Sequence, residues 1–275
     1  MWRGLAVRVS HPIERLRWIA RAESESATVL AAEAAWTLAE LVEAEPAALL
    51  TACRRLLERH PDCGPLWWTA ARLVSADDAL EEGRLAADQL CSDSTPDRLA
   101  GALRGAVATG EVILLTVPAD LSRQALEKGR AWAVRLLSGH FGIRYEMGSL
   151  APLTGGVTGY LAGEEDEALD GASVLLVEAL AAGGARCLVE PVAAGALEAA
   201  AAARVPAWIV VGTGRALPGR LFERAVDESE RRGSGVAVPA GSFACGIGPD
   251  GQGEPGEVIA SVTCPPGLEL LRRAI

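Results

Sequence analysis

The segment from residue 173 to 214 constrains the fold of this chain more than any other. It reads SVLLVEALAAGGARCLVEPVAAGALEAAAAARVPAWIVVGTG. A Val/Leu run is followed by a Gly-Gly loop, an Ala-rich stretch of helical length and a second apolar run that ends in GTG. Continuous apolar runs are typical of strands that are covered on both faces. The segment therefore predicts a strand, a helix and a second strand of one parallel sheet.

The same alternation begins near residue 111. EVILLTVPA and RAWAVRLLS predict strands, DLSRQALEKG predicts a helix, and HFGIRYEMGS predicts a loop with a short strand. We expect LTGGVTGYL, residues 153–161, to form a helix or a turn. Repeated units of this kind predict a Rossmann-like parallel sheet with helices on both faces and right-handed crossovers.

The first part of the chain has a different pattern. From residue 12 to about 105, apolar residues recur at three- and four-residue steps, which indicates amphipathic helices. Ser24 and Ser26 are candidate caps of the first long helix. We expect Trp67 and Trp68 to pack in a core or an interface. The predicted fold is α/β, with an N-terminal helical domain (residues 1–105) and a Rossmann-like domain (residues 106–275).

Charge and hydropathy exclude several classes of partner. The net charge is −10 and the isoelectric point is near 5.0, so no basic footprint predicts direct nucleic-acid binding. The most apolar window, residues 194–211, is interrupted by Glu198, Arg204 and Pro206, which argues against a membrane span. No secretory signal pattern is apparent at the N-terminus. We expect a cytoplasmic protein.

Neither a metal nor a cofactor is predicted. The six cysteines form no CxxC pair, and His11, His60 and His140 do not lie near them at metal spacing, so we expect free, buried thiols. GxGxxG does not follow the first predicted strand, and GxxxxGK[ST] does not occur. The GTG at residues 212–214 is a weak dinucleotide signal, and a tight strand exit explains it more simply.

Ligand candidates follow from the predicted sheet, because open α/β sheets bind ligands beyond the carboxyl ends of their strands. Arg135, Ser138 and Gly139 follow the second strand of this sheet. The principal candidates for ligand binding are Thr116, Asp120, Glu178, Gly183, Gly184, Gly212, Thr213 and Arg215.

Three of these positions have two readings each. Asp120, with Ser122, also suits capping of the helix that follows. Arg215 beside two glycines suits either a phosphate contact or a solvated surface. Glu178 ends an apolar strand, where a carboxylate needs solvent or a partner. A crevice would supply the solvent, and either a helix dipole or Arg186 would supply the partner.

Several motifs together carry a family resemblance. LLERHPDCGPLWWTA, residues 56–70, is similar to a helix of the type LLxxARPTxxxLxxA. One known pattern is a strand ending in VGAD, a loop near NG, then NKxGT, an Ala-rich helix and xPxxV. In this chain VEAL, the Gly-Gly loop, the Ala-rich helix and VPAWIVV stand at the places of VGAD, NG, the helix and xPxxV. In this order of parts the chain resembles the α, β and δ subunits of translation initiation factor 2B. That family includes methylthioribose phosphate isomerase and ribose bisphosphate isomerase. The resemblance implies a helical N-terminal domain before a Rossmann-like domain.

The departures from the family pattern concern its chemistry. The isomerases' catalytic Cys and Asp fall near Val117 and Leu180, and NKxGT falls near residues 189–193, without its Asn, Lys or Gly-Thr. Valine and leucine cannot transfer protons. The resemblance therefore implies a pseudoenzyme: a cytoplasmic regulatory or binding protein that forms homodimers or larger homo-oligomers. Its ligand would be a small phosphorylated metabolite, either a sugar phosphate or a nucleotide.

Two alternatives stay open. The first is an aldose-ketose sugar-phosphate isomerase with relocated catalytic groups, in which Glu178 and Asp120 are the acid and base. The second is a structural interaction protein without a small ligand, whose helical domain recruits a partner. Residues 232–257 are rich in Gly and Pro, so we expect either a lid or a surface loop there.

Overall fold

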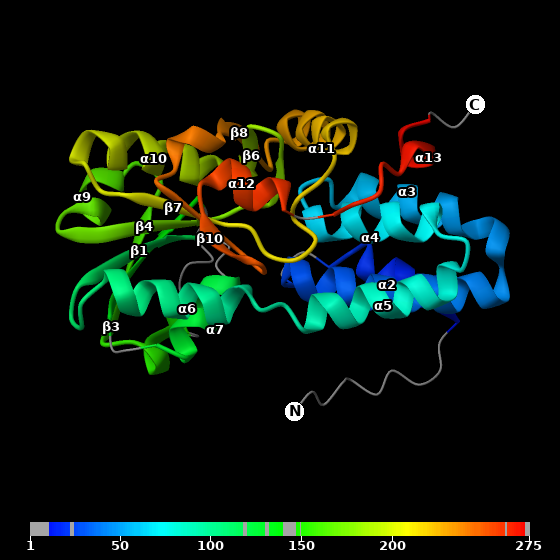
Figure 1. The fold of residues 1–275 in the computed structure, drawn as a ribbon, viewed down its shortest axis with the longest axis horizontal. Helices are drawn as coiled ribbons and strands as arrows, with labels where there is room; N and C mark the ends of the chain where they lie inside the picture. Colours follow the sequence, from blue (N-terminus) through cyan, green and yellow to red (C-terminus); the bar gives the residue numbers. More distant parts are fainter. Residues whose placement is uncertain are drawn as a thin grey trace.

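A central sheet of seven strands organises the C-terminal part of the molecule (Figure 1). The computed structural model describes residues 11–22, 25–117, 120–129, 132–139, 147–148, 150–261 and 263–272. The strand order is β10-β9-β7-β4-β1-β2-β3. Only the β9–β10 pair is antiparallel within this sheet. The strands are β1 (Val112–Thr116), β2 (Ala133–Ser138), β3 (Gly156–Leu161), β4 (Ala172–Glu178), β7 (Ala207–Val210), β9 (Cys245–Gly248) and β10 (Gly251–Gly253).

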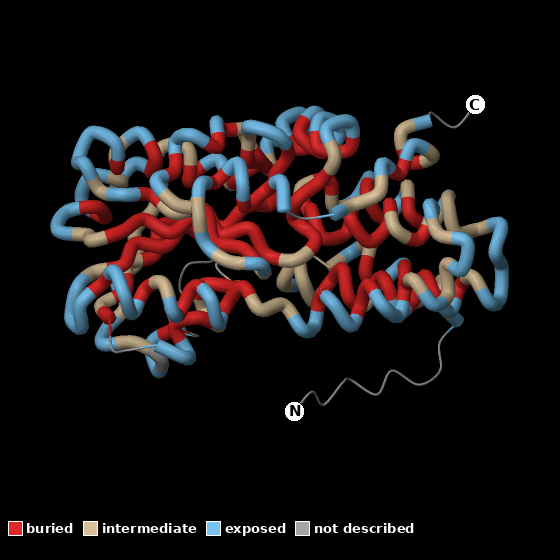
Figure 2. The backbone as a smooth tube through the Cα atoms, viewed as in Figure 1, coloured by how far each residue is buried: buried red, intermediate tan, exposed pale blue. Residues whose placement is uncertain are grey.

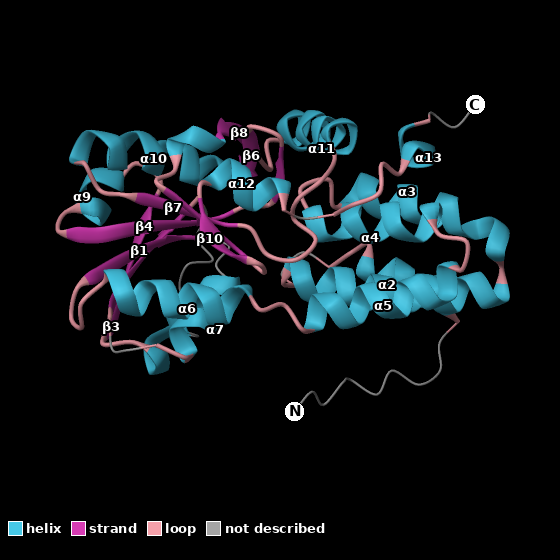
Figure 3. Cartoon of the chain, in the orientation of Figure 1, coloured by secondary structure: helices cyan, strands magenta, loops and turns pink. Residues whose placement is uncertain are grey.

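Strands β3 to β9 follow the order 3-2-1-4-5-6 of a doubly wound sheet. Helices cover both faces, as Figure 3 shows. Ile113 and Leu115 pack in one core cluster with the helices α6 and α7, whereas Leu114 packs in another with α10. This two-sided burial explains the continuous apolar run and confirms the predicted fold class. The helices around the sheet are α6 (Thr95–Ala106), α7 (Asp120–Glu127), α9 (Glu165–Leu169), α10 (Pro191–Ala203) and α12 (Pro255–Ala260).

A helical bundle forms the other end of the molecule. Ser26 caps α2 by accepting a hydrogen bond from the Val29 N–H at 3.5 Å, while Ser24 lies outside the described residues. Trp67 and Trp68 are buried in the bundle core, as predicted. A Cβ at Gly83 would lie 2.8 Å from the Ala39 Cβ, so glycine allows α5 to approach α2 closely. The bundle helices are α1 (Pro12–Ile19), α2 (Ala27–Ala44), α3 (Leu49–Arg59), α4 (Gly64–Ser75) and α5 (Ala79–Cys91).

Two segments join the bundle to the sheet. α6 packs against α7 and β9, so it lies with the sheet (Figure 1). The short helix α13 (Leu268–Leu271) returns from the sheet to pack on α3 and α4. The proposed domain division at residue 105 stays a prediction, and the packing of α6 favours a division before residue 95. No helix among the described residues is long and apolar enough to cross a membrane.

The structure corrects two of the local predictions. Residues 156–161 are the edge strand β3, paired with β2, and not a helix or turn. Three glycines in LTGGVTGYL obscure the alternation that a strand would show. Most of HFGIRYEMGS lies outside the described residues. Residues 232–257 are neither a lid nor a loop, because they contain β8 (Val236–Pro239), β9 and β10 and begin α12.

The Gly-Gly loop of the 173–214 segment is a β-hairpin. Its strands β5 (Ala181–Gly183) and β6 (Arg186–Val189) form a second, three-stranded antiparallel sheet with β8. Gly184 has φ +59°, which permits the tight turn between them. The central strands of the main sheet are largely buried (Figure 2), and so is this hairpin, whereas the edge strands β3 and β10 are not. The hairpin lies between β4 and α10, where the sequence suggested only a loop.

Candidate functional site

The carboxyl ends of β1, β4 and β7 meet at one edge of the sheet. Thr116 ends β1 and Glu178 ends β4, and these two strands are neighbours. The strand order reverses between them, which is the topological switch point where ligands bind in such sheets. Asp120 begins α7 at the same edge, and its charge acts on Glu178. The structure therefore brings Thr116, Asp120 and Glu178 together.

Glu178 is held by two partners inside the protein. Its side chain is 1% exposed. The Ser122 backbone N–H, in the first turn of α7, donates to Glu178 Oε1 at 2.7 Å. Arg215 Nη2 lies 3.5 Å from Glu178 Oε2. The carboxylate thus serves as a remote cap for α7, so the helix-terminus reading is correct and pairing with Arg186 is wrong. Arg186 pairs instead with Glu223, at 2.5 Å.

Burial decides the ionisation of this carboxyl group. Loss of water raises the pKa of Glu178 to about 7; the charge of Arg215 and the bond from Ser122 lower it in part, and Asp120 raises it further. A carboxyl group that titrates near neutral pH suits general acid–base chemistry. Such chemistry also requires contact with a substrate, and this side chain is enclosed by protein.

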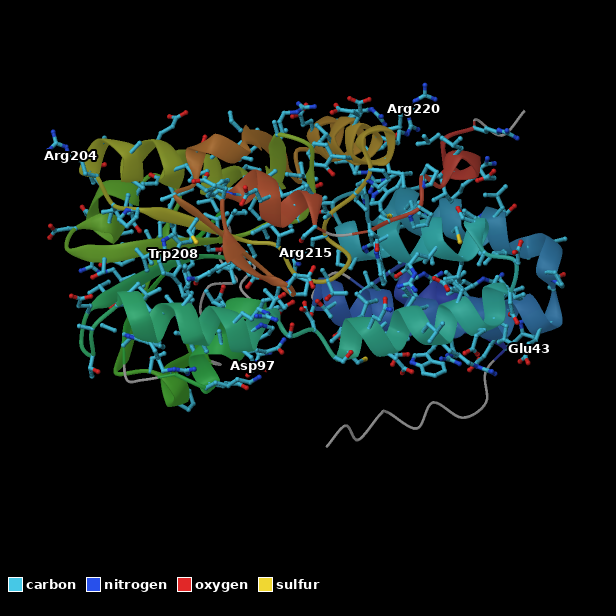
Figure 4. The ribbon with its side chains drawn as sticks, viewed as in Figure 1. Glu43, Asp97, Arg204, Trp208, Arg215 and Arg220 are labelled. Atoms are coloured by element: carbon cyan, nitrogen blue, oxygen red, sulfur yellow. The ribbon has the colours of Figure 1, made fainter. Side chains whose placement is uncertain are left out.

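Arg215 lies at the junction of the bundle and the sheet (Figure 4). Its side chain is 2% exposed, so the solvated-surface reading is wrong. Arg215 Nη1 donates to the Ala179 carbonyl. Arg215 Nε is buried without a hydrogen-bond partner among the described residues. Both terminal nitrogens of this guanidinium are therefore directed at the end of β4, at Glu178 and Ala179.

The GTG loop fastens the bundle to the sheet. The Thr213 N–H donates to Asp93 Oδ2 at 2.9 Å. Asp93 Oδ1 accepts from the N–H and hydroxyl of Thr95, at 2.9 and 2.6 Å. A Cβ at Gly212 would lie 2.7 Å from Asp93 Oδ2, and Gly214 has φ +79° and faces Pro65. The glycines are explained by this close approach.

Gly183 and Gly184 lie elsewhere, in the β5–β6 hairpin. A Cβ at Gly183 would lie 2.4 Å from Phe222 Cγ, so this glycine serves packing. Gly184 lines a separate cavity of about 230 Å³ with residues 216–219, Ile259, Ala260 and Cys264. Of the eight predicted ligand positions, these two do not join the edge that holds Glu178.

The remaining candidates on β2 have structural surroundings. Arg135 Nη1 donates to the carbonyls of Ala168, at 2.9 Å, and Asp170, at 2.5 Å. Ser138 is buried at the end of β2, and Gly139 is exposed. Arg135 therefore joins β2 to the end of α9.

Val117 and Leu180, the two positions that the sequence resemblance matched with catalytic residues, are both buried among apolar groups. Val117 packs with the core beside α7, and Leu180 packs into the bundle core. The Gly64 N–H donates to the Leu180 carbonyl at 2.9 Å. A Cβ at Gly64 would lie 2.3 Å from that oxygen. The start of α4 therefore covers the chain at Leu180.

An acidic pair at this junction was missed by sequence reasoning. Glu190 precedes α10, within the segment that aligns with NKxGT, and Asp62 approaches it from the bundle. Burial, and secondarily the charge of Asp62, raise the pKa of Glu190 to about 7. Asp93 was missed as well, although SDSTPD carries a capping signal before a Pro. Acidic groups therefore gather at the junction of the bundle and the sheet.

The stability of the protein should depend on Glu190 in a defined pH window. In the folded state the Glu190 carboxyl group stays protonated up to about pH 7, whereas its ordinary pKa is 4.5. The protonated group therefore contributes its full stabilisation below pH 4.5, and this stabilisation is lost as the pH rises through 7. Between these limits the wild type should lose about 1–3 kcal/mol that Glu190→Gln does not lose. Urea unfolding at both ends of the window measures this, with the exposed Glu43→Gln as control. Equal slopes for all three proteins would contradict the assignment.

The cysteines are only partly as predicted. Burial raises the pKa of the Cys53, Cys63 and Cys187 thiols to about 12, which leaves them unreactive at neutral pH. Cys91 is exposed, and Cys245 and Cys264 are half-buried, so not all six are buried thiols. Among the described residues, no group of three His, Cys, Asp or Glu is placed to hold a metal ion.

Comparison with known proteins was informative only at the level of structure. No protein-family model matches the chain, and no curated protein matches its sequence. It is similar to a solved structure of the eIF2B β subunit from Chaetomium thermophilum, with 15% identity, 90% of each chain covered and a TM-score of 0.66.

Two further structures show the same likeness. The chain is similar to the translation initiation factor eIF-2B of Pyrococcus horikoshii, with 14% identity, 90% and 98% of the two chains covered and a TM-score of 0.69. The tetrameric eIF2B β2δ2 complex of C. thermophilum gives 15% identity, coverage of 90% and 93%, and a TM-score of 0.67. The resemblance inferred from sequence is thus confirmed in three dimensions, and the chain has the fold of the eIF2B β and δ subunits.

Proposed function

We propose that this chain is a non-catalytic, cytoplasmic binding or regulatory protein. The observation that carries the proposal is the enclosure of Glu178. The titratable group best suited to acid–base chemistry at the strand edge is 1% exposed and is bonded to Ser122 and Arg215. A general acid or base must come within hydrogen-bond reach of its substrate. The packing at Leu180 and the contact of Gly64 with it keep the bundle over this edge.

We also propose that the protein works as a homo-oligomer. Support comes from the fold, since one of the similar structures is a tetrameric complex of eIF2B β and δ subunits. Sedimentation equilibrium of the full chain tests this directly. A homodimer or larger assembly is the expected result, and a monomer throughout the concentration range would contradict it.

We propose a small phosphorylated metabolite as the candidate ligand of the strand edge. Arg215 is the cation that would meet it, and the unpartnered Nε is the atom that argues for such a contact. Its neighbours Glu178 and Asp93 would repel a phosphate. If the edge is purely structural, ribose 5-phosphate and AMP will leave the melting temperature unchanged; if either binds there, the shift should vanish in Arg215→Met.

The alternative with a specific observation in its favour is sugar-phosphate isomerisation through Glu178, because its pKa is near 7. An assay of aldose–ketose conversion with ribose 5-phosphate separates the two functions. We expect no turnover in the wild type or in Glu178→Gln. Turnover in the wild type and in Glu43→Gln that is lost in a folded Glu178→Gln would establish the enzyme and overturn our proposal.

A further inference from the structure

A groove in the helical bundle gathers arginines away from the strand edge. It occupies about 460 Å³ between the end of α1 and the last turns of α3. That volume is within the range of small-molecule sites, about 300–1,000 Å³. We call it the arginine groove, and it is lined by Arg17, Ala20, Arg21, Arg55, Glu58 and Arg59.

The charges in this groove are largely uncompensated. Arg17 pairs with Glu14 outside the lining. No described acidic side chain pairs with Arg21, Arg55 or Arg59, whereas arginines elsewhere, such as Arg72 and Arg123, have carboxylate partners. A chain with a net charge of −10 thus concentrates unpaired cations in one concavity. Positive charge that is focused in this way attracts anions.

The walls of the groove are fixed by contacts from behind. His60 Nε2 donates to the Ile19 carbonyl at 2.9 Å and so joins the ends of α3 and α1. Arg232, from α11 (Gly219–Arg232), donates to the carbonyls of Glu58 and Arg59. These bonds also satisfy carbonyls that the end of a helix leaves free. The arginine side chains are therefore carried on backbone that does not need to rearrange to bind.

Three arginines without a carboxylate partner among the described residues favour a multivalent anion. Four arginines and Glu58 give the lining a formal charge of +3, and the Glu14 partner of Arg17 reduces it to +2. Two helix C-termini, at about −0.5 each, leave roughly +1. Guanidinium groups bind phosphate oxygens in pairs, so several adjacent phosphates can engage several arginines together. Among the described residues, the lining contains no aromatic side chain that could stack on a base.

We propose that the arginine groove binds a compact polyphosphate anion, and that the phosphates, not an attached nucleoside, are recognised. This site is separate from the strand edge and does not depend on the function proposed above. The probe is inorganic triphosphate, titrated into the full chain by calorimetry at low and at physiological salt. ATP and ribose 5-phosphate are the comparison ligands.

The expected pattern is specific. Triphosphate and ATP should bind with similar Kd, ribose 5-phosphate should bind at least tenfold more weakly, and binding should weaken as salt rises. Arg55→Gln/Arg59→Gln should lose at least tenfold in affinity. The matched control Arg123→Gln/Arg224→Gln removes two arginines that have carboxylate partners outside the groove and should change Kd less than twofold.

A variant that should bind more tightly is a useful control, because a damaged fold cannot explain a gain in affinity. Glu58→Gln removes the acidic group of the lining and should tighten triphosphate binding about threefold to fivefold, by the Coulomb energy of one nearby charge. Absence of triphosphate binding, or equal loss in both double variants, would overturn the proposal. A short RNA that binds far more tightly than triphosphate through the same arginines would overturn it in favour of a nucleic-acid surface.

Discussion

Replacement of Arg215 with methionine is expected to lower the free energy of unfolding by about 3–5 kcal/mol at pH 8. The variant leaves Glu178 buried without its guanidinium partner, and a carboxylate without water or a counter-ion is costly. At lower pH the cost should shrink, because Glu178 has a pKa near 7 and takes up a proton. Urea unfolding at pH 8 and pH 5.5 measures both effects.

The controls for this prediction separate charge from packing. Arg123→Met breaks the exposed i,i+4 pair with Glu127 on α7 and should cost less than about 1 kcal/mol. The double variant Glu178→Leu/Arg215→Met removes both buried charges and should recover most of the loss, because two apolar groups need no partner. If Arg215→Met costs no more than Arg123→Met, the Glu178–Arg215 pair does not have the energetic role that its burial implies.

Gly64→Ala is the second substitution with a large expected effect. The added methyl carbon would lie 2.3 Å from the Leu180 carbonyl oxygen and 3.1 Å from the Ala181 Cα. Because the obstacle is backbone, α4 must move away from the hairpin, and the 2.9 Å bond from the Gly64 N–H to Leu180 is weakened. We expect a loss of about 1–3 kcal/mol or more in the free energy of unfolding.

The matched control is Gly105→Ala in α6, where a Cβ meets nothing within 4 Å. Alanine in a helix is favoured over glycine, so this variant should gain about 0.5–1 kcal/mol. Chemical denaturation of the two variants side by side tests the contrast. A neutral Gly64→Ala would mean that α4 and the hairpin are free to separate, which would weaken the case for a covered edge.

Local pattern was sufficient for four strands of the main sheet, β1, β2, β4 and β7. The run Ile113, Leu114 and Leu115 is apolar at every position because both faces of β1 are covered, and that signal is readable without a structure. The sequence did not predict β3, because Gly156 and Gly159 leave the strand without a recognisable apolar face. The sequence did not predict the β5–β6 hairpin either, because its strands are short and its Gly-Gly turn resembles an ordinary loop.

The site was predictable in position but not in its contacts. Glu178 stands out in the sequence as a carboxylate at the end of an apolar strand. Its partners could not be read there, since Ser122 is 56 and Arg215 is 37 residues away. Asp93 contacts Thr213 across 120 residues, and no periodicity encodes such a pair. Arg186 looked plausible only because it is near in sequence.

The return of α13 to the bundle has a consequence for the order of folding. Arg54 Nη2 donates to the Glu269 carbonyl, 215 residues away, and Leu270 is buried in the bundle core. Contacts between residues so distant in sequence close large loops and form late. On the ribosome, helices α1 to α5 emerge long before the segment that completes their packing. Although these helices emerge before the sheet, they are therefore among the last elements to become fully native.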